Sequence, residues 1–254
     1  MERIDAVTAA KKFIENHFPN CQGAVLAGSV VRGEATDTSD LDIVIFDNNV
    51  NSSYRESLIE LGWPIELFVH NLTSYKFFFD QDYKVAKPSL QRMVSEGIIL
   101  KDEGVVWNIK KEADHILKEG PEEWSIETIN VKRYFLTDIL DDFIGAKILG
   151  EELLIANTLS ILLQEFYLRV NKQWIGTSKW IIRALKQYDK EFARKYVESF
   201  EWYYKTGEKD KVIKLTDEVL EPFGGRLFDG FSVGKEKKGN DRKLNWCKRV
   251  RPLL

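Results

Sequence analysis

The fold is decided by the stretch Gly28-Ser-Val-Val-Arg-Gly-Glu-Ala-Thr-Asp-Thr-Ser-Asp-Leu-Asp42. A short apolar run from Gly23 to Gly28 leads into it and predicts a buried strand that ends at a glycine. The residues from Asp40 to Phe46 predict a second strand, because they are rich in β-branched side chains and are followed by turn-forming residues. A Gly-Ser turn therefore follows the first strand, and a polar loop leads from it to the second.

The residues at the two ends of this loop indicate a chemistry. Gly28 allows the backbone to approach a ligand closely, and exposed N–H groups beside the Ser29 hydroxyl suit phosphate oxygens. Asp40 and Asp42 are two residues apart at the start of a strand, so their carboxylates share one face. Two such acids repel each other and are costly to desolvate. A divalent cation relieves both problems, and oxygen ligands of this kind favour Mg²⁺.

A third acid lies further along the chain. The run from Ile65 to Val69 predicts a third strand, in which Glu66 is the one charged residue. Its neighbours Ile65 and Leu67 should face the opposite side of the sheet. Three carboxylates beside a phosphate-binding turn predict a site in which two metal ions handle a nucleoside triphosphate.

This combination resembles the nucleotidyltransferase superfamily of the polymerase-β type. The resemblance covers about the first third of the chain and lies in four features in this order: Gly28-Ser29, Arg32-Gly33, Ser39-Asp40-Leu-Asp42, and the strand acid Glu66. It implies a short mixed sheet flanked by helices. It also implies a reaction in which an acceptor hydroxyl attacks the α-phosphate of a nucleotide and pyrophosphate leaves.

The resemblance also implies roles for the residues. Asp40 and Asp42 would bind two Mg²⁺ ions, and Glu66 would complete the acidic trio or act as the base. Gly28 and Ser29 would hold the triphosphate of ATP or of another nucleoside triphosphate. For Arg32 two roles are open, a contact with phosphate or a brace within the loop through Asp37 or Glu34, and bracing is favoured.

The remaining sequence predicts mostly helix and an α+β fold. A helix is expected from Ile4 to Phe18, and the pattern becomes helical again from about Ser74. A boundary near Pro121 divides a catalytic domain, residues 1–120, with a small mixed β-sheet flanked by helices, from an all-α helical bundle, residues 121–254. The bundle helices are expected at Ser125–Leu149, Glu151–Val170 and Ser178–Tyr188, with more helix up to Leu220.

This order of domains resembles the aminoglycoside and lincosamide nucleotidyltransferases. The segment Trp174-Ile-Gly-Thr-Ser-Lys-Trp180 is similar to the one that opens a bundle helix in that group. A lysine at a helix N-terminus adds its charge to exposed N–H groups. Lys179 is therefore predicted to contact the β- and γ-phosphates, and the competing interpretation is a surface lysine near a helix start.

Composition bounds the class of protein. The chain has 254 residues, of which 30% are charged, and a net charge of −3. Two cysteines, Cys21 and Cys247, are too few for a disulfide scaffold or a zinc ribbon. The first residues lack the apolar core of a signal peptide, and the apolar stretch from Leu153 to Leu163 is too short to span a bilayer. We therefore expect a cytoplasmic protein that is not embedded in a membrane.

The charges are unevenly distributed. Lys235 to Arg251 holds eight basic and two acidic residues, so the rest of the chain is acidic. The basic run is typical of a solvated terminus, and a contact with phosphates or an acidic partner is the alternative. The acidic body argues against a nucleic-acid partner and favours cationic acceptors.

These observations favour transfer of AMP, or another nucleoside monophosphate, to a hydroxyl of a small molecule such as an aminoglycoside-type antibiotic. Two alternatives stay open. One is nucleotidylation of a partner protein, as in antitoxin-like relatives, and the other is a catalytically silent nucleotide-binding protein. The apolar faces of the bundle are compatible with a homodimer.

Overall fold

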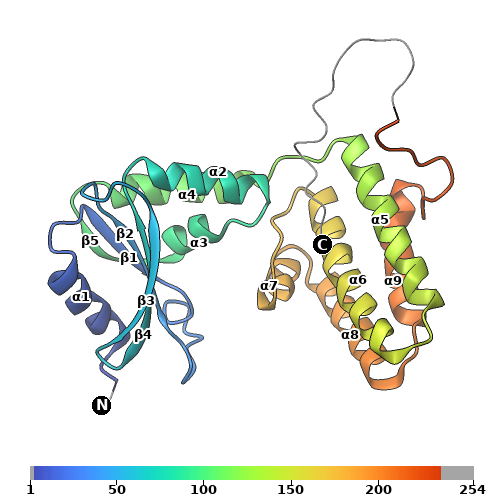
Figure 1. The fold of residues 1–254 in the computed structure, drawn as a ribbon, viewed down its shortest axis with the longest axis horizontal. Coiled ribbons are helices and arrows are strands. Elements are labelled where there is room, and N and C mark those ends of the chain that lie inside the picture. Colours follow the sequence, from blue (N-terminus) through green and yellow to red (C-terminus); the bar gives the residue numbers. More distant parts are fainter. Residues whose placement is uncertain (1–2, 236–254) are drawn as a thin grey trace, which may run out of the picture. The chain divides into compact units, whose positions relative to one another are not determined.

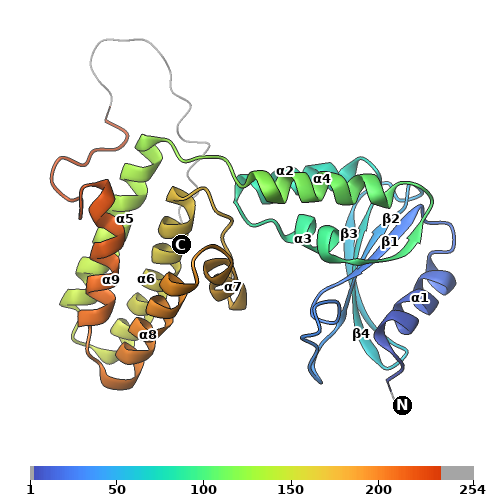
Figure 2. The ribbon, with the colours of Figure 1, turned by 180° about the vertical axis from the view of Figure 1, so that it is seen from behind.

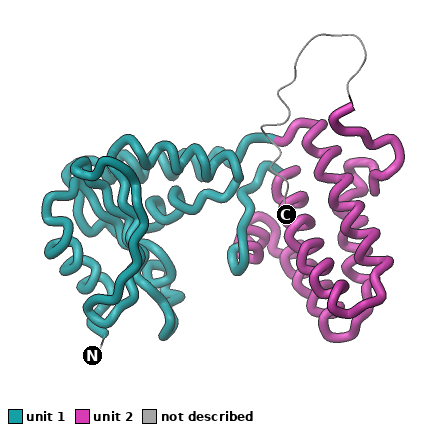
Figure 3. The backbone as a smooth tube through the Cα atoms, in the orientation of Figure 1, with its two compact units in different colours: residues 1–123, 171–180 teal, residues 124–170, 181–254 magenta. Residues whose placement is uncertain are grey.

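The computed structural model describes residues 3–235, which form two compact units (Figure 3). Within these residues the first unit comprises residues 3–123 and Asn171–Trp180, and the second comprises Trp124–Val170 and residues 181–235. The first junction between the units lies three residues beyond the expected boundary at residue 120. The segment Asn171–Trp180, which the sequence assigned to the bundle, belongs instead to the first unit.

The first unit contains a five-stranded mixed sheet in the order β3-β4-β2-β1-β5. Only β2 and β4 are parallel, and the other neighbours are antiparallel. This arrangement confirms the expected α+β class. The strands are β1 (Gly23–Ala27), β2 (Leu41–Phe46), β3 (Tyr54–Glu60), β4 (Trp63–His70) and β5 (Ile98–Asp102).

Helices cover both faces of this sheet, α1 on one face and α2 to α4 on the other (Figures 1 and 2). Every residue of β1 is buried, as are all but one of β2, because these central strands pack against apolar side chains on both sides. Their uninterrupted apolar runs follow from this. The helices of this unit are α1 (Ala6–His17), α2 (Ser74–Lys84), α3 (Ser89–Glu96) and α4 (Val106–Glu119).

Two strands were not expected from the sequence. β3 is an edge strand whose side chains are mostly exposed, so it has neither an apolar run nor a clear alternation. β5 is five residues long and lies within the region that was expected to be helical throughout. It pairs with β1 at the other edge, so its formation depends on a partner far away in the sequence.

The second unit is helical. Within it, α5 packs against α6 and α9, and α8 packs against α9. Ser125 caps α5 through a hydrogen bond from the Thr128 N–H group, and the helix ends at Gly145 rather than continuing to Leu149. The elements are α5 (Ile126–Gly145), α6 (Leu149–Val170), α7 (Lys179–Tyr188), α8 (Lys190–Thr206), α9 (Asp210–Leu220) and the short 3₁₀ helix η1 (Glu221–Phe223).

Among residues 3–235, α6 is the one helix long and apolar enough to cross a membrane by length and composition. Its 22 residues extend beyond the apolar stretch that the sequence judged too short. A core helix of a soluble protein passes the same test, and Leu159 and Leu163 of α6 are fully buried. Cys21 is a buried free thiol. Cys247 and all of the basic run except Lys235 lie outside the described residues.

Candidate active site

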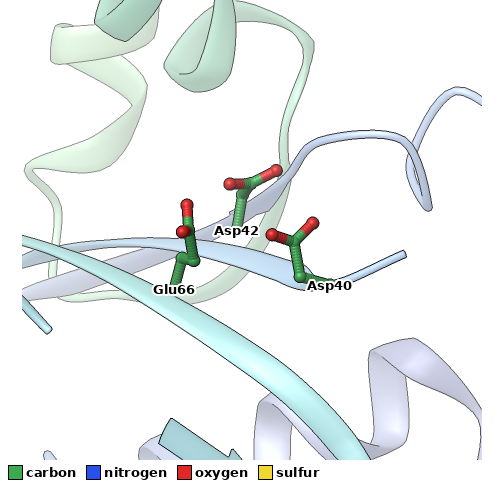
Figure 4. Close-up of side chains that lie close together, drawn as sticks. All are labelled: Asp40, Asp42 and Glu66. Carbon is green, nitrogen blue, oxygen red and sulfur yellow. The ribbon is translucent and has the colours of Figure 1, made fainter. Parts of the chain in front are cut away.

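Three acids meet at one end of the two parallel strands. Asp42 of β2 and Glu66 of β4 are direct partners in the register, and Asp40 immediately precedes β2. One carboxylate oxygen from each of the three lies within 4.8 Å of the others. Figure 4 shows the three carboxylates on the same side of these strands. The structure thus brings together the three acids that the sequence singled out.

The strand alternation explains why the acids point away from the core cluster beneath α1. Leu41, Ile43, Ile65 and Leu67 are buried in the core beneath α1. Because successive side chains alternate between faces, Asp42 and Glu66 project to the other face of the sheet. All three acids are half-buried.

Asp42 is the acid most perturbed by this arrangement. Burial, together with the charges of Asp40 and Glu66, raises the pKa of Asp42 to about 6. Arg32 and Arg55 act in the opposite direction. The three carboxylates therefore concentrate negative charge that the two arginines compensate only in part.

Gly28 lies directly against this cluster. It follows β1, and its φ of +81° lies in the left-handed region that favours glycine. A Cβ atom at this position would lie 2.1 Å from Oδ2 of Asp42. Glycine is therefore needed both for the backbone conformation and to leave room for the Asp42 carboxylate.

The loop after Gly28 is held by hydroxyl groups. The Ser29 hydroxyl donates to the Ser39 hydroxyl at 3.0 Å, and Ser39 in turn accepts from the Thr36 N–H group at 2.8 Å. The Glu34 N–H group donates to the Ser29 carbonyl at 3.0 Å. These contacts close the loop onto itself and hold Ser29 next to the residue that precedes Asp40.

Arg32 braces this loop. Its guanidinium donates to Glu34 within the loop and to Glu96 at the end of α3, at 3.2 Å in each case. The same guanidinium lies over the ring of Trp180, 5.0 Å from the centroid, and Arg92 lies 5.1 Å from that centroid. The contact with Glu34 is the one expected for a bracing role. Glu96, Arg92 and Trp180 were not identified from the sequence.

The segment Asn171–Trp180 joins the first unit through several contacts. The Trp174 indole donates to the Leu117 carbonyl at 2.9 Å, and the Ile175 N–H group donates to the Ala86 carbonyl at 2.9 Å. Both side chains are buried. Lys179 is the exposed first residue of α7, directly before the Trp180 that contacts Arg32. Lys179 is therefore adjacent in sequence to Trp180, which contacts Arg32 in the loop that follows Gly28.

Arg55 is a further residue that sequence reasoning missed. It lies on the edge strand β3, and its Nη2 donates to Oε2 of Glu66 at 2.5 Å. Because the sequence did not predict this strand, nothing placed Arg55 near the acids. An edge strand is marked in a sequence by polar residues at every second position. In β3 charged residues occur at odd and even positions alike, so this signal was obscured.

The donor set fits a hard divalent cation. All three groups are carboxylates, which supply the oxygen ligands that Mg²⁺ prefers, and strands fix their positions. Burial and the mutual repulsion of the acids, which together raise the pKa of Asp42, are both relieved when a cation binds. The residues present therefore fit the metal that the resemblance implies.

The chain is similar to known proteins. A family model described as a nucleotidyltransferase domain matches residues 7–85, which include all three acids and the Gly28-Ser29 turn. A solved structure of a nucleotidyltransferase-like protein from Exiguobacterium sibiricum 255-15 is similar with a TM-score of 0.47 and 12% identity, covering 85% of this chain and 74% of that chain. Among curated proteins, none matches the sequence.

Proposed function

We propose that the chain transfers AMP from ATP to a hydroxyl of a small molecule in a Mg²⁺-dependent reaction, because a family model described as a nucleotidyltransferase domain matches residues 7–85. At the coarser level the protein is a nucleotidyltransferase enzyme that uses a nucleotide substrate. The observation that supports the proposal best is the cluster of Asp40, Asp42 and Glu66, whose oxygens lie within 4.8 Å of one another. Gly28 lies directly against this cluster, where a Cβ atom would clash with the Asp42 carboxylate.

Each group has a defined part in such a reaction. The acceptor oxygen forms a bond to the α-phosphorus, the bond to the pyrophosphate oxygen breaks, and the hydroxyl proton leaves to a base. The backbone at Gly28 and the Ser29 hydroxyl bind the triphosphate and orient it, while Arg32 keeps the loop closed through Glu34 and Glu96. Transfer of this kind depends mainly on positioning and on stabilising negative charge.

Asp40, Asp42 and Glu66 would hold the metal ions. When bound, Mg²⁺ supplies positive charge that stabilises the phosphate oxygens as the bond order changes. We assign to Glu66 either completion of this ligand set or the role of base. These assignments follow the donor chemistry and the closeness of the three side chains.

Calorimetric titration of a non-hydrolysable ATP analogue, with and without Mg²⁺, tests the proposal. We expect binding that requires Mg²⁺, because the acids repel a triphosphate unless a cation lies between them. Absence of binding to ATP, GTP, CTP and UTP analogues alike would overturn it. Mg²⁺-dependent binding would justify an acceptor screen that begins with aminoglycosides and lincosamides, since the acidic body of the chain favours cationic acceptors.

Lys179→Ala is expected to raise the nucleotide KM about three- to tenfold, with a smaller effect on kcat. Lys179 begins α7, and the contact of the adjacent Trp180 with Arg32, in the loop proposed to bind phosphate, supports this role. Steady-state kinetics with varied ATP measures this. Lys186→Ala, also exposed and on the same helix, is the matched control. Equal KM values in both variants would refute the role of Lys179.

Three further parts of the proposal concern the setting of the enzyme. We propose that it works in the cytoplasm, that nucleic acid and membrane are not its partners, and that it forms a homodimer. The last point is supported by exposed apolar residues at the start of α6, among them Leu149 and Leu154. Sedimentation equilibrium of the full chain tests the dimer, and a monomer at micromolar concentration would contradict it.

A further inference from the structure

Arg55 holds the one carboxylate of the acidic cluster that lies on β4. Its Nη2 donates to Oε2 of Glu66 at 2.5 Å, and the Arg55 side chain is 60% exposed whereas that of Glu66 is 28% exposed. A guanidinium stays charged at every physiological pH. A permanent positive charge therefore lies against a group to which a divalent cation would bind.

The structure also offers Arg55 a second partner. In the antiparallel register Arg55 lies opposite Phe68, which is two residues beyond Glu66 on the same face of β4. The Arg55 guanidinium lies 4.8 Å from the centroid of the Phe68 ring. An aromatic face attracts a guanidinium without any carboxylate. Arg55 can therefore release Glu66 and remain on Phe68 with a small rotation of an exposed side chain.

We propose that Arg55 is a displaceable counter-ion that occupies Glu66 in the metal-free enzyme and moves away when a divalent cation enters. This rests on the proposed function, because it assumes that the three acids bind metal. In the free site Arg55 offsets part of the charge of the three acids and lowers their affinity for a lone cation. The metal then binds mainly together with the triphosphate, whose own negative charge restores the attraction that Arg55 removes.

This role differs from that of a residue that merely orients Glu66. An orienting arginine would strengthen metal binding, because it would fix a ligand in the correct position. A counter-ion weakens metal binding, because two cations close together repel each other. Removal of the Arg55 charge therefore changes the metal affinity in opposite directions under the two interpretations.

The test is the dissociation constant of Mn²⁺, measured by electron paramagnetic resonance of free Mn²⁺ with nucleotide-free protein. For Arg55→Gln we expect a Kd about three- to tenfold lower than that of the wild type. Arg55→Lys retains the charge and should stay within about twofold of the wild type. In the presence of a non-hydrolysable ATP analogue, the difference between wild type and Arg55→Gln should shrink.

Arg194→Gln is the matched control. Arg194 is an arginine with the same exposed fraction, 60%, and it also pairs with a glutamate, Glu198, but on α8 of the second unit. It changes the net charge equally and should leave the Mn²⁺ affinity unaltered. Weaker or unchanged Mn²⁺ binding by Arg55→Gln, with a wild type that binds Mn²⁺, would overturn this inference alone. Absence of Mn²⁺ binding in both proteins would overturn the proposed metal site, and this inference with it.

Discussion

Gly28→Ala is expected to lower kcat/KM for nucleotidyl transfer by about a hundredfold or more while the fold persists. The new Cβ would lie 2.1 Å from Oδ2 of Asp42, so the carboxylate must rotate out of the acidic cluster. Displacement of a metal ligand by about an ångström is enough for a loss of this size. The measurement is steady-state kinetics, with the Mn²⁺ dissociation constant as an independent readout.

Gly33→Ala separates this clash from backbone strain. Gly33 lies in the same loop with a φ of +70°, close to the +81° of Gly28, but a Cβ there meets no atom within 4 Å. Both variants carry the left-handed penalty of about 1 kcal/mol. Only the alanine at position 28 displaces Asp42. Comparable losses of activity and Mn²⁺ binding in the two variants would show that strain in the loop, and not the carboxylate, is responsible.

The Asp42→Asn variant is expected to lose about a thousandfold in kcat/KM and to gain stability in the absence of metal. The loss of activity follows from removal of a charged metal ligand, which is worth several kcal/mol in the transition state. The gain in stability follows from removal of a half-buried charge that Asp40 and Glu66 repel. A residue that costs folding energy and is required for turnover is the pattern of a functional site.

The pH dependence gives the sign of the stability effect. The pKa of Asp42 is raised from 3.8 to about 6 on folding, so the folded state binds its proton more tightly than the unfolded state. The stability that this proton contributes is complete below about pH 3.8 and is lost as the pH rises through 6. At pH 8 in EDTA, the free energy of unfolding of Asp42→Asn should therefore exceed that of the wild type by about 1–3 kcal/mol. The variant should accordingly unfold at a higher temperature.

Asp37→Asn provides the comparison for this measurement. Asp37 is exposed in the same loop and outside the acidic cluster, so the variant changes the net charge equally without relieving the repulsion. Thermal unfolding of the three proteins at pH 5 and pH 8 should show a pH-dependent gain for Asp42→Asn only. Full activity in Asp42→Asn would contradict the assignment of Asp42 as a metal ligand.

The sequence predicted the strands whose own side chains are mostly apolar and buried. β1, β2 and β4 carry apolar runs because they lie at or near the middle of the sheet, and the residues on either side of Glu66 are buried as its strand position implies. β3 escaped prediction because an edge strand does not need an apolar face, and β5 because its only strand partner is β1, far away in the chain.

The site was predictable to the same extent. Spacing along single strands was sufficient to place Asp40 and Asp42 on one side, and the adjacency of two strands then added Glu66. The groups that contact the acids and the adjoining loop come from elements without such a pattern. Arg55 reaches Glu66 from the unpredicted edge strand, and Trp180 reaches Arg32 from a segment far along the chain. Their positions depend on tertiary contacts, which periodicity does not record.

Because Asn171–Trp180 belongs to the first unit, the gene cannot be cut at a single point into two segments that each encode one whole unit. A gene fragment that stops at residue 123 would encode all five strands but would lack Trp174, Ile175 and Trp180. The carbonyls of Leu117 and Ala86 would lose their donors, and Arg32 would lose the ring over which it lies. Exchange of the helical bundle between relatives by recombination at one junction would therefore separate the first unit from its segment Asn171–Trp180. The sequence of the second unit is interrupted by ten residues of the first. Either unit can therefore be replaced intact only if these ten residues stay with the first unit.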